Sequence, residues 1–162
     1  MKITHQAAIS EVIYAIIKLP PHLKEAFSRG NPFDKLLRSY SEHTSIGERL
    51  YKSKKRSYKH YPFSVKASNQ FKKTGSLVGL HAEHVTPLSL IKKRLNSGSI
   101  KSEIGVKRFL AKHNQVVVTT KEEQRKIDSK FRSKMPPNGK SRLEYFGIKI
   151  AKSTEKNTLK SK

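Results

Sequence analysis

The residues in this chain best suited to catalysis are Glu83 and His84, adjacent residues near the end of a predicted strand. Hydrolysis of a phosphodiester needs a general base for the attacking water and a cation that neutralises charge on the phosphate. Because a turn follows, the two side chains can diverge, one holding the cation and the other activating water. His81 has three open interpretations: a metal ligand, a phosphate contact or a surface histidine.

A second group of polar residues lies at the start of a helix predicted over residues 120–133. Thr120 and Glu123 have the spacing of a capping box, which explains Glu123 without a metal, although a ligand role stays open. Gln124 lies beside the apolar stripe of this helix, and Asp128 follows one turn later. The candidate metal ligands are Glu83, His81, Gln124, Asp128 and Glu123.

The charge balance points to a polyanionic partner. Thirty-five lysines and arginines stand against twelve acidic residues, a formal net charge of +23. Self-repulsion of this size destabilises a compact chain, and a nucleic acid relieves it with release of counterions. We therefore expect DNA, double-stranded above all, without excluding RNA. A non-catalytic nucleic-acid-binding protein is the rival, but it leaves the scarce acidic residues beside His84 unexplained.

The elements that must position these residues are helices and two short strands. Apolar residues at helical spacing predict a helix over 5–18, and prolines suited to a first helical turn start two more, over 21–28 and 32–41. Thr86 is the predicted N-cap of a later helix. The remaining pattern predicts a strand over 77–80, helices over 87–95 and 102–112, a strand over 115–119, the helix over 120–133 and a strand or ordered segment over 142–150. The expected divisions are a helical region over 1–75, a catalytic core over 76–133 and an extension over 134–162 that ends in a disordered basic tail.

Lysines and arginines alternate with aromatic residues over 49–73. This composition suits phosphate contacts and stacking on unpaired bases, while the alternative is a basic loop whose aromatic side chains anchor it to the core. The candidate nucleic-acid contacts are Lys54, Lys55, Arg56, Arg94, Arg125, Arg132 and Arg142.

Residues 80–89 (LHAEHVTPLS) together with 116–123 (VVVTTKEE) resemble the HNH, or ββα-metal, nucleases. That superfamily includes colicin-type DNases, homing endonucleases and many restriction enzymes. The resemblance implies that Glu83 is a metal ligand and His84 the general base. It also implies that the 115–119 strand pairs with the strand before His81 and that the following helix packs across both. The implied fold is α+β, a ββα-metal core with a helical N-terminal layer and inserted helices.

The chain departs from the family pattern at two places. Gln124 stands where members often carry a metal-binding histidine; an amide suits a hard cation, so we expect one Mg²⁺, with Mn²⁺ or another transition metal as alternatives. The middle asparagine of the motif falls at Gln115 or Asn114, where it would fix the loop that carries the base. The scissile phosphate is expected to be held by an arginine, with Arg125, Arg94 and Arg142 as candidates.

The remaining features bound the setting. Apolar runs fall short of the roughly 20 residues of a membrane span, and the N-terminus lacks the pattern of a signal peptide, so we expect a cytoplasmic protein without a membrane partner. With no cysteine, a metal must be held by histidine, carboxylate or amide groups. A palindromic target would favour a homodimer. A restriction endonuclease fits these features, and a secreted DNase toxin is an alternative.

Overall fold

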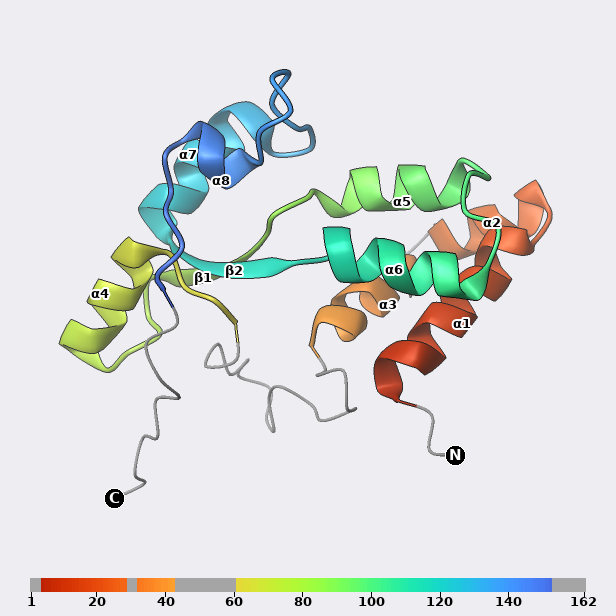
Figure 1. The fold of residues 1–162 in the computed structure, drawn as a ribbon, viewed down its shortest axis with the longest axis horizontal. Helices are drawn as coiled ribbons and strands as arrows, with labels where there is room; N and C mark the ends of the chain where they lie inside the picture. The colour runs from red at the N-terminus through yellow and green to blue at the C-terminus, as the bar shows by residue number, and fades with distance from the viewer. Residues whose placement is uncertain (1–3, 29–31, 43–60, 153–162) are drawn as a thin grey trace.

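The computed structural model describes residues 4–28, 32–42 and 61–152. Within these ranges the chain is α+β, with eight helices and one two-stranded antiparallel sheet (Figure 1). The predicted α+β class is therefore confirmed at this coarse level. The ββα-metal core remains a prediction, and so do the domain boundaries.

Three N-terminal helices confirm the predicted helical layer: α1 (His5–Lys18), α2 (Pro21–Ser28) and α3 (Pro32–Ser41). The Thr4 hydroxyl accepts a hydrogen bond from the backbone of α1 and caps its start. Helices α1 and α3 bury isoleucine, leucine and aromatic side chains against one another.

The two inserted helices pack onto this layer. Helix α5 (Leu88–Asn96) and helix α6 (Glu103–His113) lie beside α1 and α3 at one end of the molecule (Figure 1). The four helices share one apolar core, made of Ile9, Ile13, Ile16, Ile17, Phe33, Leu37, Tyr40, Ile91, Leu95, Val106 and Leu110. The insertion thus joins the N-terminal helices to the strands that flank it.

The sheet forms from β1 (Leu80–His84) and β2 (Val116–Thr120), with Glu83 opposite Val117 and His84 opposite Val116. Helix α7 (Lys121–Phe131) follows β2 directly and contacts both strands. The strand pairing and the helix across it agree with what the resemblance implies. A short helix, α8 (Arg142–Tyr145), packs against α7.

The predicted strand over 77–80 lies three residues too early. Gly79 has a positive φ of 82°, and the Leu80 N–H bonds the Leu77 carbonyl, so this segment is a turn. The Val78 side chain is 81% exposed. The strand therefore begins at Leu80 and contains the whole His81–His84 segment.

The prediction that Thr86 caps α5 is wrong. Pro87 occupies the N-cap position without a side-chain cap, and its carbonyl accepts from Leu90 and Ile91. The segment 142–150 opens with helix α8, which has a capping box between Ser141 and Glu144. Only Ile150 makes a strand-like bridge there, with Ser64.

Helix α4 (Val65–Thr74) replaces part of the predicted basic and aromatic segment. The Ser64 hydroxyl caps its start, and Gly75 ends it with a φ of 63°. Phe63 and Phe71 pack with their ring centroids 5.7 Å apart against Ala67, Leu80 and Val118. For these two rings the structure supports anchoring to the core; residues 49–60 lie outside the described residues.

Candidate functional site

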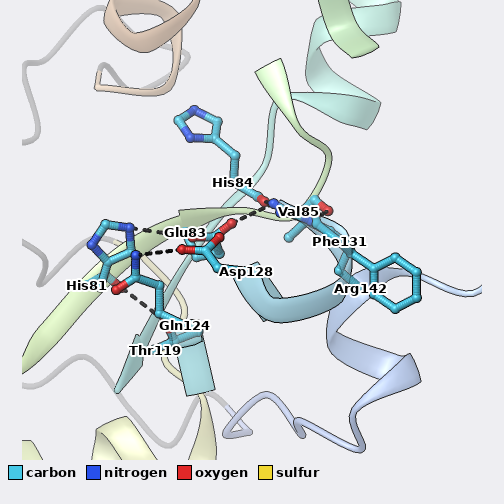
Figure 2. A network of polar contacts seen from close by, with 9 residues as sticks. All are labelled: His81, Glu83, His84, Val85, Thr119, Gln124, Asp128, Phe131 and Arg142. Carbon is cyan, nitrogen blue, oxygen red and sulfur yellow. Dashed lines mark hydrogen bonds and ion pairs between the residues drawn. The ribbon is translucent and has the colours of Figure 1, made fainter. Parts of the chain in front are cut away.

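The alternation of β1 separates the two proposed catalytic side chains. Successive residues of a strand point to opposite faces, so His81 and Glu83 share one face and His84 lies on the other. Val117, opposite Glu83, packs against Ile127 of α7, so the face with His81 and Glu83 is the one that α7 covers. Figure 2 shows the His84 ring directed away from His81 and Glu83.

Glu83 is buried, with 8% of its surface exposed, and its carboxylate is held by Arg142. The Arg142 Nη2 atom donates to Glu83 Oε1 at 2.5 Å. The guanidinium, itself 2% exposed, also donates to the carbonyls of His84, Val85 and Phe131. A single cation thus neutralises Glu83 and ties the end of β1 to the end of α7 (Figure 2).

The second oxygen of Glu83 faces His81. Glu83 Oε2 lies 3.4 Å from His81 Nε2, and the His81 side chain is 42% exposed. The carbonyl of His81 accepts a hydrogen bond of 3.4 Å from the hydroxyl of Thr119 on β2. Of the three interpretations of His81, the structure gives it a direct polar contact with the candidate ligand Glu83.

Helix α7 directs two further oxygen-bearing side chains toward the same group. Gln124 Nε2 donates to Asp128 Oδ2 at 3.2 Å, and both side chains point toward His81 and Glu83 in Figure 2. Both residues are only partly exposed. The sequence register that placed Gln124 beside the apolar stripe therefore agrees with the structure.

Glu123 belongs to another cluster. The capping box with Thr120 is confirmed, and Glu123 Oε2 accepts from the Thr120 N–H at 2.9 Å and from the Ser64 hydroxyl at 2.6 Å. This oxygen is used to cap α7 and to bind the N-cap residue of α4. We therefore assign Glu123 a structural task and leave it out of the proposed metal site.

The environment of Glu83 favours its ionised form. Burial, the largest single influence, raises its pKa, but the hydrogen bond with His81 and the charge of Arg142 together outweigh burial and hold the pKa below 4.5. Because the folded-state pKa is depressed, the stability that the carboxylate contributes is present above pH 4.5 and is lost as the pH falls toward the folded-state value.

We predict that Glu83→Gln lowers the urea midpoint at pH 7 and that its difference from wild type narrows at pH 3. At the lower pH the wild-type carboxyl itself becomes neutral, so the two proteins carry similar groups. Urea unfolding at both pH values measures this. A difference that stays constant between pH 7 and pH 3 would contradict the ionised state of Glu83.

The donor set fits a cation that retains most of its water. Among the residues that the structure describes, no three histidine, aspartate or glutamate side chains lie close enough to enclose a metal ion. Two donors each about 2.0–2.2 Å from one cation are roughly 3–3.5 Å apart, as His81 Nε2 and Glu83 Oε2 are. Mg²⁺ typically uses one or two protein carboxylates together with waters and substrate phosphates. The arrangement suits such an open site and not a closed four-ligand zinc site.

The predicted phosphate contacts divide into three groups. Arg142 is wrong as a holder of the scissile phosphate, because its guanidinium is buried and bonded to the protein. Arg94 on α5, Arg125 on α7 and Arg132 after α7 are exposed and available to an anion. Lys54, Lys55 and Arg56 lie outside the described residues.

The candidates for the middle asparagine fix the start of β2. Asn114 is buried, and its Nδ2 atom donates to the Leu37 carbonyl at 2.6 Å. The Gln115 carbonyl accepts from the N–H of Val85 at 2.9 Å. Gln115 therefore holds the residue after His84 through its backbone, while Asn114 ties β2 to α3.

Comparison with known proteins leaves the chain's own geometry as the guide to function. No protein-family model, curated protein or solved structure matches this chain. In the part of the chain that the structure describes, no helix is both long and apolar enough to cross a membrane.

Sequence reasoning missed the two polar contacts that organise the site. The Glu83–Arg142 pair joins residues 59 positions apart, as does the Ser64–Glu123 hydrogen bond. The sequence does carry a signal for the helix that presents Arg142, because Ser141 and Glu144 have capping-box spacing. It carries no signal for the partner of Arg142.

Proposed function

We propose that this protein is a divalent-metal-dependent endonuclease that hydrolyses DNA phosphodiester bonds. The observation that carries the proposal is the placement of Glu83: a buried carboxylate with a lowered pKa, whose second oxygen faces His81, on the strand that ends in His84. In a chain of net charge +23, a carboxylate repels a phosphate unless a cation lies between them.

In this proposal the two faces of β1 have separate tasks. Glu83 Oε2 and His81 Nε2 hold the cation, and Asp128 and Gln124 supply further oxygen atoms from α7. The cation, when bound, neutralises charge on the phosphate and on the leaving oxygen. His84, at the end of the strand, removes the proton from the attacking water.

The surface charge supplies binding to the DNA backbone. Arg125 and Lys121 are exposed on α7, and Arg132 is exposed just beyond its end, so α7 carries positive charge beside the proposed cation site. Contacts of lysine and arginine with phosphates position a duplex without reading its sequence. We therefore expect DNA affinity to fall steeply with salt.

A second candidate function is binding of nucleic acid without cleavage. It is favoured by the close pairing of Glu83 with Arg142, which already neutralises the carboxylate that the cation needs. It is also favoured by the two-donor character of the site within the described residues. Under this alternative the His81–Glu83–Arg142 group only stabilises the fold.

Plasmid nicking separates the two functions. We expect supercoiled DNA to be nicked in Mg²⁺ or Mn²⁺, the activity to disappear in EDTA, and activity to return when excess metal is added. Glu83→Ala should remove nicking, while Glu122→Gln, a matched change at an exposed residue of α7, should leave it intact. Tight binding of the plasmid without nicking in either metal would establish the second function.

A further inference from the structure

A cavity of about 490 Å³ lies where α6 ends and β2 begins. This volume is within the roughly 300–1,000 Å³ of sites for small organic ligands. The described residues that line it come from α1, α3, α6 and β2 and from the segments at Tyr61 and Ile150, and none of them is charged. Its ligand is therefore neutral where it enters the cavity, which sets this site apart from the phosphate-binding surface.

The cavity contains a buried hydrogen-bond acceptor that the protein does not use. Asn114 lines the cavity and is only 5% exposed. Its Nδ2 atom donates to the Leu37 carbonyl, which fixes the orientation of the amide and leaves Oδ1 as an acceptor. Among the described residues, Oδ1 is one of the few buried side-chain atoms without a hydrogen-bond partner. Buried acceptors are normally satisfied, so this one calls for an N–H or O–H group from a ligand.

The other walls of the cavity suit a flat, aromatic ligand. Tyr40 and Tyr61 contribute aromatic surface, and Leu110 and Val116 contribute aliphatic surface. Burial raises the pKa of Tyr40, so its hydroxyl stays neutral. The Tyr61 hydroxyl is held by the Ser41 carbonyl at 3.1 Å. Apolar and aromatic walls around one oriented acceptor are features of sites that bind a heterocycle with an N–H edge.

The cavity is close to the proposed catalytic strand end. Val116, one of its lining residues, is the cross-strand partner of His84. Opposite residues in an antiparallel pair have Cα atoms about 4.5–5.5 Å apart. A nucleotide next to a phosphate bound at His84 therefore has its base within reach of this cavity.

We propose that this cavity is a nucleobase pocket, in which an unstacked base of the nucleic acid donates an N–H group to Asn114 Oδ1. The inference rests on the proposed action on nucleic acid and adds a site where a base, and not the phosphate, is recognised. Taking a base out of the helical stack costs energy, so single-stranded or distorted DNA is favoured over regular duplex. The pocket would thus give the enzyme a structural preference that the basic surface alone lacks.

The direct test is titration with free nucleosides in EDTA, followed by ¹H–¹⁵N NMR. Adenosine, cytidine, guanosine and thymidine are added separately, and the side-chain amide of Asn114 and the backbone amide of Val116 are monitored. We expect saturable shifts of these signals with at least one nucleoside. Shifts that never saturate, or the absence of shifts with all four, would overturn the pocket.

Two variants test the pocket in different ways. Ala111→Phe fills the cavity from an exposed helical position, and Asn114→Leu removes the acceptor; each should weaken nucleoside binding about 10-fold or more, as expected for loss of contacts to one base. Ala15→Phe is the matched control, because Ala15 is exposed on α1 and does not line the cavity. If Asn114→Leu fails to fold, Ala111→Phe still decides the question. Unchanged affinity in Ala111→Phe contradicts the proposal.

The outcomes distinguish this inference from the proposed function. Nicking of plasmid without any nucleoside binding would retain the nuclease and remove the pocket. Nucleoside binding without nicking would retain the pocket in a non-catalytic binding protein. Replacing one base of a single-stranded oligonucleotide by an abasic residue should weaken its binding in EDTA, and Ala111→Phe should abolish that difference.

Discussion

Replacing His84 by alanine should lower the rate of metal-dependent plasmid nicking by about 10²–10⁴-fold, the usual contribution of a positioned general base. The physical reason is the loss of the group that takes the proton from water. His84 lies on the face of β1 opposite Glu83, so removing its ring leaves the His81–Glu83 contact in place. We therefore expect Mn²⁺ affinity and DNA affinity in EDTA to stay within about twofold of wild type.

His81→Ala gives the contrasting result. It removes a proposed cation donor, so the nicking rate should recover as the metal concentration is raised, whereas the rate of His84→Ala should not. His22→Ala on α2 serves as the control, because that exposed histidine is remote from the site in sequence and lies in the helical layer. Nicking at the wild-type rate by His84→Ala would remove His84 from the mechanism and leave His81 as the candidate base.

Replacing Arg142 by methionine should lower the free energy of unfolding by about 3–5 kcal/mol, as expected when one partner of a buried ion pair is removed. Glu83 would be left buried without its cation, and the carbonyls of His84, Val85 and Phe131 would lose their donor. Equilibrium unfolding in urea at pH 7 measures the change. Arg132→Met, at an exposed position just after α7, should change stability by less than about 0.5 kcal/mol.

The double variant Arg142→Met with Glu83→Gln isolates the ion pair. Once Glu83 is neutral, the loss of the arginine leaves no buried charge, so the double variant should be more stable than Arg142→Met alone. Additive losses from the two single changes would show that Arg142 acts through its carbonyl contacts and not through Glu83.

The local elements of this fold are largely predictable from sequence because their signals are local. The helix over 5–18 follows from apolar spacing, and the start of α7 follows from the capping box of Thr120 and Glu123. The β-branched run over 115–119 gives β2 within one residue. Helix α4 was missed because only Ala67 and Phe71 mark its apolar face, and alternating basic and aromatic residues obscured it.

The candidate site is less predictable because its organisation depends on tertiary contacts. The sequence indicates that Glu83, His84, Gln124 and Asp128 are chemically suited to a site, but not which of them share a face. Strand alternation, once β1 is known to start at Leu80, separates His84 from the others. The burial of Arg142 had no local signal, and an arginine near a basic tail is more readily interpreted as a phosphate contact.

The hydrogen bond between Ser64 and Glu123 links the folding of two distant helices. One carboxylate oxygen binds the N-cap residue of α4 and caps α7, so the starts of both helices depend on the same atom. A ten-residue helix such as α4 has little stability by itself. The amides of α4 should therefore exchange with solvent in the same cooperative opening that releases α7 from the sheet, and hydrogen exchange along α4 would report when the catalytic end of the molecule is formed.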